Sequence, residues 1–174
     1  MTVSDSLEFT PAPRASTATV DPLDRLVAIE AIRLLKSRYF QAVDEKTWST
    51  IAELFTDDAR VDFGGEGQYH VGHHGVTAEA NSEEWVVVGG AAAARVIAGA
   101  VSKVISVHQG HDPQIEIISA NHAAGRWSMY DRLEYENEVM HGYGHYIETY
   151  ARDETGWKFS SLLLTRLRVV WESK

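Results

Sequence analysis

Four long segments rich in β-branched and aromatic residues follow one another in the second half of the chain, at 103–118, 123–135, 139–152 and 157–171. Short clusters of turn-forming residues separate them, at 119–121, 136–137 and 153–156. Such short connections join antiparallel neighbours, since parallel strands need a much longer crossover. The pattern therefore predicts a four-strand antiparallel meander that ends the chain.

The first third of the chain is typical of helix. Asp21 followed by Pro22 is a helix start, with a capping carboxylate and a proline at the first helical position. An apolar stripe follows, made of Leu23, Leu26, Ile29, Ile32, Leu35, Tyr39 and Val43. A second, short helix is predicted to begin at Thr47 or Ser49 and to end near residues 57–58. Helices first and a meander last predict an α+β fold in which the sheet curls round the first helix.

The segments between these two parts are less regular. Residues 59–63 and 68–71 read as two short strands joined through glycines. Residues 74–101 read as one or two helices broken at Gly89 and Gly90. Residues 1–20, rich in Ser, Thr, Pro and Ala, are predicted to be a disordered tail, which leaves 21–174 as a single domain.

Composition excludes several classes of function. The 174 residues carry 16 Lys and Arg against 25 Asp and Glu, a formal net charge of −9 at pH 7. A nucleic-acid partner is not expected, because such a protein needs a basic surface. The absence of cysteine excludes disulfides and a thiol nucleophile. With no signal-like start and no apolar segment long enough to cross a bilayer, we expect a cytoplasmic protein without membrane contact.

Several stretches together resemble the SnoaL-like proteins of the NTF2-like superfamily. They are I-R-L-L-K-S-R-Y-F-Q-A-V-D at 32–44, V-H-Q-G-H-D-P-Q-I-E-I at 107–117, A-A-G-R-W-S-M-Y-D at 123–131 and G-Y-G-H-Y-I-E-T-Y at 142–150. The resemblance covers about Leu23 to Val170. It implies a cone-shaped, cystatin-like barrel in which a bent antiparallel sheet wraps the first helix around an apolar pocket. The family includes scytalone dehydratase, bile-acid 7α-dehydratase, the lindane dehydrochlorinase, isomerases, cyclases and binding modules, so the fold alone does not decide the function.

Two residues match the catalytic pair of the eliminating members of this family. The resemblance places Asp44 at the end of the first helix and His108 on a sheet strand, with the carboxylate orienting the imidazole. A neutral imidazole is a competent base near pH 7, since its unperturbed pKa is about 6.5. His111 lies three residues further on and is expected to point to the opposite face of the strand. We therefore expect His108 to be the base, and His111 is the second candidate.

Two further residues are candidates for acid or oxyanion roles. Tyr39 matches the tyrosine that dehydratases of this family use to donate to a substrate oxygen, although a core tyrosine on the apolar stripe would look the same. Asp131 alternates with Trp127 and Met129, which places a carboxylate in an apolar wall. The alternative for Asp131 is an ion pair with Arg132 or Arg166.

The remaining candidates are pocket-lining residues and a metal cluster. His111, Trp127, Met129, Tyr143, His145 and Trp171 are the predicted substrate contacts. His70, His73 and His74 lie near Asp62 and Glu66, but their spacing matches no regular metal motif. We therefore expect neither a metal nor a cofactor.

The sequence favours a dehydratase-type lyase that acts on an apolar, ring-bearing molecule of steroid, polyketide or aromatic type. A cyclase or isomerase with the same base remains open, and so does a binding module without catalysis. The last segment is apolar on both faces, with Leu162, Leu164 and Val170 on one and Leu163, Leu167 and Val169 on the other. A strand covered on both faces predicts a homodimer or a higher homo-oligomer.

Overall fold

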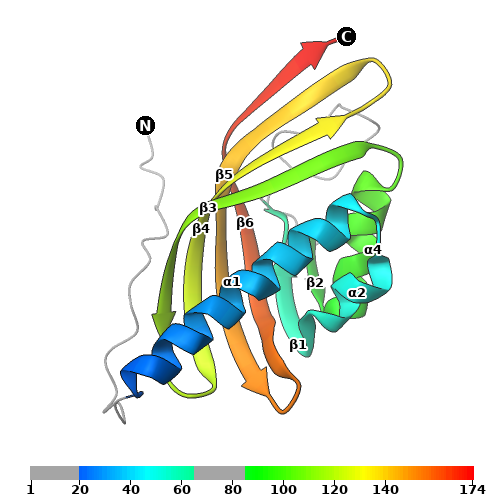
Figure 1. Cartoon of the computed structure of the whole chain (residues 1–174). Helices are drawn as coiled ribbons and strands as arrows, with labels where there is room; N and C mark the ends of the chain where they lie inside the picture. Colours follow the sequence, from blue (N-terminus) through cyan, green and yellow to red (C-terminus); the bar gives the residue numbers. More distant parts are fainter. Residues whose placement is uncertain (1–19, 65–84) are drawn as a thin grey trace, which may run out of the picture.

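The computed structural model describes residues 20–64 and 85–174. Two helices open the described chain and a curled sheet closes it (Figure 1). The elements are α1 (Pro22–Asp44), α2 (Trp48–Glu53), β1 (Phe55–Asp62), β2 (Val86–Val88), α4 (Gly90–Val101), β3 (Ile105–Ile117), β4 (His122–Glu134), β5 (Glu138–Asp153) and β6 (Gly156–Ser173).

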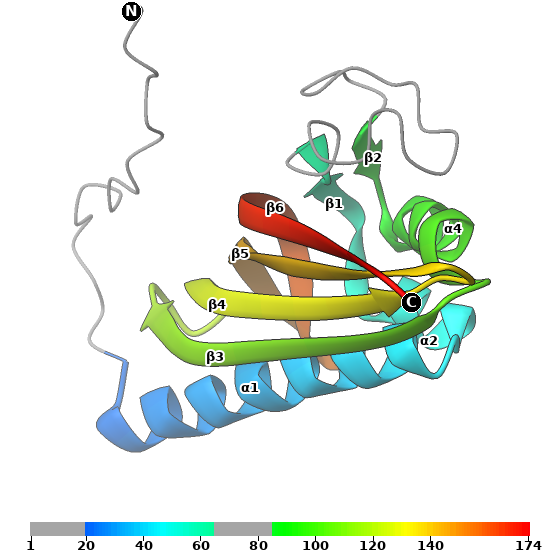
Figure 2. The same cartoon turned by 90° about the horizontal axis from the view of Figure 1, so that it is seen from above.

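The six strands form one sheet in the order β2-β1-β6-β5-β4-β3. Figures 1 and 2 show the sheet curling while α1 runs across one of its faces. The predicted α+β class, the long first helix and the final meander are confirmed, although the sheet curls without closing as a barrel. The expectation of a purely antiparallel sheet is wrong at one place, since β1 pairs with β6 in parallel. The chain between them supplies the long crossover that a parallel pair requires.

Helix α1 begins where the sequence predicted, because the side chain of Asp21 accepts hydrogen bonds from the backbone N–H groups of Leu23 and Asp24. Its buried residues are Ala28, Ile32, Leu35, Lys36, Tyr39, Ala42 and Val43. The predicted stripe is wrong at its start, where Leu23 and Leu26 are exposed. A three-residue step falls about 60° short of a full turn, so a stripe built on such steps drifts round the helix and off the buried face.

Strand β1 starts at Phe55, four residues earlier than predicted and inside the segment read as the second helix. Phe55 and Val61 are buried, and the N–H of Phe159 donates to the carbonyl of Leu54 at 2.9 Å where the two strands join. The predicted partner strand 68–71 lies outside the described residues. Among the described residues, β1 pairs with β2 on one side and with β6 on the other.

Residues 86–88, which the sequence placed in a helix, form a strand. Three consecutive valines favour an extended backbone, and Gly89, at φ 85°, separates this strand from α4. Helix α4 then packs closely on α2, because a Cβ atom on Gly90 would overlap the backbone carbonyl oxygen of Ala52. The two glycines therefore mark a change from strand to helix.

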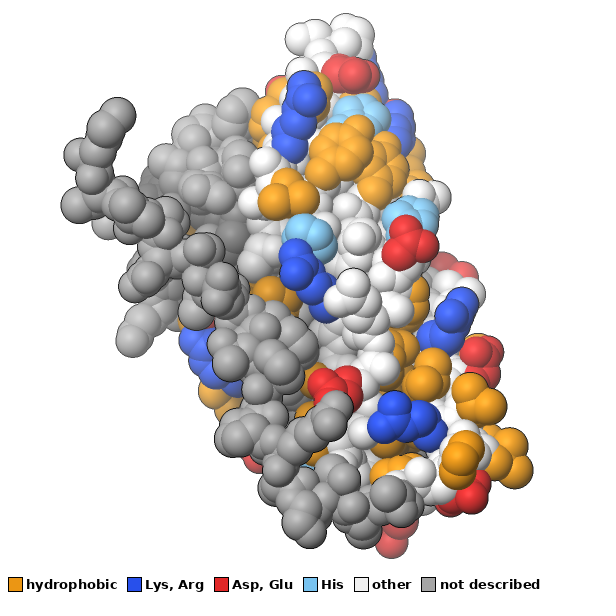
Figure 3. Space-filling view, turned by 90° about the vertical axis from the view of Figure 1, so that its left-hand side faces the viewer, with side chains coloured by type: hydrophobic (Ala, Val, Ile, Leu, Met, Phe, Trp, Pro, Cys, Tyr) orange, Lys and Arg blue, Asp and Glu red, His pale blue; other side chains and the backbone are white. Residues whose placement is uncertain are grey.

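Charges of both signs are interspersed on the described surface. Figure 3 shows one face on which basic, acidic and hydrophobic side chains alternate. Of the helices in the described ranges, none has both the length and the apolar character that a membrane span requires.

The close contact between α4 and α2 predicts opposite effects for two Gly→Ala substitutions. Gly90→Ala should lower the melting temperature, because the new methyl group meets the backbone of α2. Gly99→Ala should raise stability by about 1 kcal/mol, since nothing lies within 4 Å of its Cβ position and alanine favours helix. Thermal unfolding followed by circular dichroism measures both; equal shifts for the two variants would contradict the packing described.

Candidate active site

A cavity of about 240 Å³ lies between the C-terminal half of α1, helix α4 and the inner face of the sheet. Its walls are mainly apolar, and its polar groups come from α1, β3, β4, β5 and β6. The described residues that line it are Tyr39, Val43, Phe63, Trp85, Val96, Ile97, Gly99, Ala100, Val101, His108, Asp131, Leu133, Tyr135, Tyr146, Leu164 and Arg166. Three of the four residues predicted to be catalytic line this cavity, namely Tyr39, His108 and Asp131. The fourth, Asp44, forms a hydrogen bond with His108.

Asp44 and His108 form a hydrogen-bonded pair at the edge of this cavity. The imidazole Nδ1 lies 2.6 Å from Asp44 Oδ1, and the backbone N–H of His108 donates to Oδ2 at 2.9 Å. The hydroxyl of Ser106, two residues earlier on the same face of β3, donates to Oδ1 at 2.9 Å. The rings of Phe40 and His108 lie nearly parallel, with an interplanar angle of 10° and a centroid distance of 6.4 Å.

The hydrogen bonds that the Asp44 carboxylate accepts determine the protonation state of the pair. Burial alone raises the pKa of Asp44, but hydrogen bonds from the side chain and backbone of His108 and from Ser106 outweigh burial and bring the pKa below its usual value. An ionised carboxylate only accepts, so the proton of a neutral imidazole must sit on Nδ1. Nε2 is then left with its lone pair, the arrangement that a general base requires.

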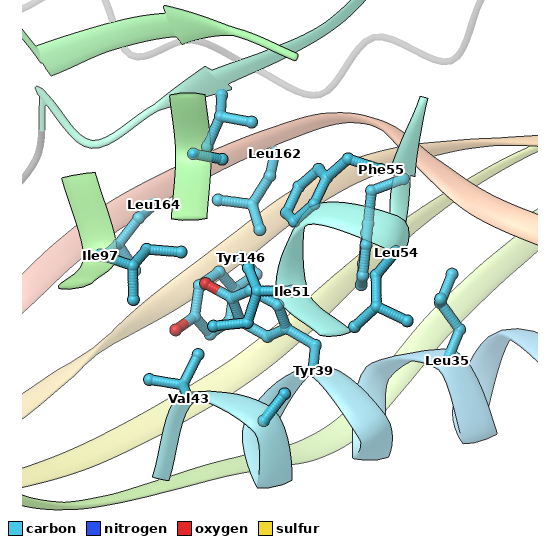
Figure 4. Packing of buried hydrophobic residues seen from close by; sticks show 14 of the residues in the cluster. Leu35, Tyr39, Val43, Ile51, Leu54, Phe55, Ile97, Tyr146, Leu162 and Leu164 are labelled. Atoms are coloured by element: carbon cyan, nitrogen blue, oxygen red, sulfur yellow. The ribbon is translucent and has the colours of Figure 1, made fainter. Parts of the chain in front are cut away.

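Two phenols meet in the cavity. Tyr39 from α1 and Tyr146 from β5 lie edge to face at a centroid distance of 6.3 Å (Figure 4). Burial, together with Tyr39 and Asp131, raises the pKa of Tyr146 well above its usual value, so this phenol keeps its proton. Asp44, the last residue of the same helix, lies about 140° round it from Tyr39 and contributes to the site through its hydrogen bond with His108.

Asp131 is buried in a two-pronged ion pair with Arg166. Arg166 Nη1 lies 2.8 Å from Oδ1, and Nη2 lies 2.7 Å from Oδ2. Both carboxylate oxygens are thereby held, and Arg166 also donates to the sulfur of Met129 at 3.4 Å. Asp131 is the register partner of His108 on the neighbouring strand, so the ion pair and the base are adjacent. The alternative that the sequence left open, an ion pair with Arg166, is the arrangement observed.

A second buried ion pair lies beneath the phenols. Lys36 Nζ donates to Glu148 at 2.5 Å, and Tyr150 donates to the other oxygen of that carboxylate at 2.5 Å. The ammonium lies 3.3 Å from the ring centroid of Tyr146. Burial lowers the pKa of Lys36 to about 8, although its interaction with Glu148 opposes the shift. This pair supports the floor of the cavity without lining it.

The six predicted substrate contacts lie elsewhere. Tyr143 and His145 are on the outer face of β5, because Tyr146 faces inward and side chains alternate along a strand. His111 is exposed on β3. The other three lie behind the lining: Trp127 donates to Tyr150 at 2.9 Å, Met129 contacts Arg166, and Trp171 packs on Tyr135 at a centroid distance of 5.7 Å.

Sequence reasoning missed Tyr146 and the inward position of Arg166 at the site. The signal was available in part, because alternation along the last strand places Arg166 on the same face as Leu162 and Leu164. Of the histidine cluster weighed for a metal, His70, His73 and His74 lie outside the described residues. Within residues 20–64 and 85–174, no group of three or more His, Asp or Glu side chains could hold a metal ion.

Known proteins share this fold and part of this sequence. Residues 24–162 match the SnoaL-like domain family. Among solved structures, a proposed scytalone dehydratase from Novosphingobium aromaticivorans aligns with a TM-score of 0.69 and 19% identity, over 84% of this chain and 89% of its own. A hexachlorocyclohexane dehydrochlorinase from Novosphingobium barchaimii gives 0.69 and 22%, over 86% and 93%. An NTF2-like protein with a cystatin-like fold from Novosphingobium aromaticivorans gives 0.60 and 19%, over 83% and 85%.

The buried pair beneath the phenols predicts a non-additive effect on stability. Lys36→Met leaves the Glu148 carboxylate buried without its cation, which should cost about 3–5 kcal/mol. Lys36→Met combined with Glu148→Gln should cost less than the single change, because no charge then remains in the core. Urea unfolding measures both. Lys158→Met, which removes a surface partner of Asp153, is the control and should cost under about 1 kcal/mol.

Proposed function

The chain belongs to the family of SnoaL-like domains, and from that premise and the cavity we propose that it is a lyase that needs no cofactor. It eliminates water from a neutral, ring-bearing substrate. The observation that carries the proposal is the His108–Asp44 pair, a base with a fixed tautomer beside two phenols and an arginine in an apolar cavity. A solvent-shielded site strengthens each of these polar interactions.

The first step is removal of a proton from carbon by His108 Nε2. The C–H electron pair moves toward the neighbouring carbonyl or ring carbon, and the imidazole becomes an imidazolium. Asp44, already ionised, stabilises this cation through Nδ1–H. The negative charge that develops on the substrate oxygen is stabilised by the guanidinium of Arg166, which Asp131 holds in place.

The second step is departure of the hydroxyl group. Tyr39 donates its phenolic proton as the C–O bond breaks, so the group leaves as water and the electron pair forms the new C=C bond. Return of the proton from His108 to Tyr39 restores both residues. Tyr146, whose raised pKa keeps it protonated, donates a hydrogen bond and transfers no proton.

Size and charge define the substrate class. An apolar cavity of about 150 Å³ holds a benzene molecule, so the 240 Å³ cavity lined by the described residues fits one or two rings. The charge of Arg166 is balanced by Asp131 and that of Lys36 by Glu148. Among the described residues that line the cavity, the one permanent cation, Arg166, is therefore paired with an anion, and we favour neutral hydroxy ketones with an aromatic or polyketide-type ring over the larger steroids.

The mechanism predicts the activity of three variants toward such hydroxy ketones. His108→Gln should lower kcat at least about 100-fold, because the base is lost. Tyr39→Phe should lower kcat about 100-fold with little change in KM, since its donor acts in the transition state. His122→Gln, which changes an exposed histidine at the start of β4, is the control and should retain activity. Water loss is followed by mass spectrometry; full activity of His108→Gln would contradict the assignment.

The same experiment in deuterated water separates the rival functions. An isomerase or cyclase with the same base would leave the substrate mass unchanged apart from incorporated deuterium. A binding module would show saturable binding by calorimetry with neither water loss nor deuterium incorporation. Either result would overturn the lyase proposal.

We further propose that the outer face of the sheet docks a second copy of the chain. Leu162 and Leu164 are buried by the core of the monomer, whereas Leu167 is 69% exposed and Tyr143 is 42% exposed on the described surface. Leu167→Glu should therefore shift a dimer toward monomer in sedimentation velocity. A wild-type chain that sediments as a monomer at micromolar concentration would contradict this proposal.

A further inference from the structure

Lys46 occupies a backbone position at which glycine is the usual residue. After α1 ends, the N–H of Thr47 donates to the carbonyl of Ala42 at 2.9 Å, and the N–H of Lys46 donates to the carbonyl of Val43 at 3.3 Å. This pair of bonds is a Schellman motif, which requires a left-handed residue after the helix. Lys46 adopts that conformation at φ 63°. A side chain with a Cβ is strained there, so its presence calls for a compensating contact.

The compensating contact leads to the His108–Asp44 pair. Lys46 Nζ lies 2.6 Å from Ser106 Oγ, and Ser106 Oγ lies 2.9 Å from Asp44 Oδ1. An ammonium only donates, so Ser106 must accept from Lys46. The single hydroxyl proton of Ser106 is then directed to Asp44. The amine thereby fixes the direction of one of the three hydrogen bonds that the carboxylate accepts.

The charge of Lys46 acts on the same pair. Its side chain is partly buried, and burial lowers its pKa while the Asp44 carboxylate opposes the shift. A cation held one hydroxyl away from Asp44 offsets part of the negative potential that the carboxylate exerts on the imidazole.

We propose that Lys46 is a positioning residue that, through Ser106, fixes the Asp44 carboxylate and lowers the pH at which His108 becomes an unprotonated base. The inference rests on the proposed function only for its effect on turnover. The contact itself can be tested on the resting protein, because the titration of His108 can be observed without a substrate.

Other charged and titratable groups line the same cavity as His108. From β4 and β6 these are the paired charges of Asp131 and Arg166, and from α1, β5 and the end of β4 they are the phenols of Tyr39, Tyr146 and Tyr135. The Asp131–Arg166 pair is internally balanced, and Tyr146 stays protonated. Lys46 is therefore a charge outside this balanced pair, and its removal should change the electrostatic potential at His108.

The test is the titration of the His108 ring by NMR in the full chain. In Lys46→Met the titration midpoint should rise by roughly half a pH unit to one unit, as expected for loss of one charge a few ångströms away at intermediate dielectric constant. Lys46→Gly relieves the backbone strain and also removes the amine, so it should raise the midpoint equally while increasing stability. Lys46→Arg should retain most of the wild-type midpoint. Lys158→Met controls for the change in net charge and should leave the midpoint unchanged.

Two outcomes would overturn the inference. One is a titration midpoint of His108 that is the same in Lys46→Met and Lys46→Gly as in the control variant Lys158→Met. The other is an effect of Lys46→Met that is not reduced at all in a Ser106→Ala background, since that hydroxyl holds the amine near Asp44 and carries part of its effect. If turnover on a hydroxy ketone is found, the acid limb of its pH–rate profile should move by the same amount. Absence of turnover with a shifted midpoint would overturn the lyase proposal and leave the role of Lys46 standing.

Discussion

The whole site depends on the hydrogen bonds between Asp44 and His108, two residues that are 64 positions apart in the sequence. They fix the end of α1 against β3, the edge strand of the sheet. Because the carboxylate accepts from both the imidazole and the backbone N–H of His108, it sets the position of the strand as well as the orientation of the ring. Tyr39, one and a half turns earlier on the same helix, is thereby directed into the cavity that His108 lines.

Paired charges allow this cavity to be both apolar and reactive. Asp131 with Arg166, and Lys36 with Glu148, place four ionised groups in the core, each with its partner within 2.8 Å. An unpaired charge at such depth would be costly. The curled sheet makes the pairing possible, since β4, β5 and β6 carry Asp131, Glu148 and Arg166, and α1 brings Lys36 against Glu148. The polar groups are held in place before a substrate arrives, which is the condition for electrostatic catalysis.

The sequence predicted the elements better than their pairing. Alternation and turn signals located the meander, and the Asp21–Pro22 start located α1, because these signals are local. The parallel pairing of β1 with β6 depends on contacts about 100 residues apart and has no local signal. The same limit applies to the site. Asp44 and His108 were indicated by a motif, whereas the buried position of Lys36 depends on Glu148, 112 residues away. His145 and Tyr143 were placed inside because the register of β5 was unknown, and a shift of one residue exchanges the two faces.

The protonation of His108 is the most direct test of the proposed chemistry. A long-range ¹H–¹⁵N correlation spectrum of the labelled protein at neutral pH reports which nitrogen of each of the eight histidines carries the proton. The His108 signals are identified by their loss in His108→Gln. We predict a neutral ring with its proton on Nδ1, facing Asp44, and an unprotonated Nε2. A proton on Nε2 instead would contradict the assignment of His108 as the base.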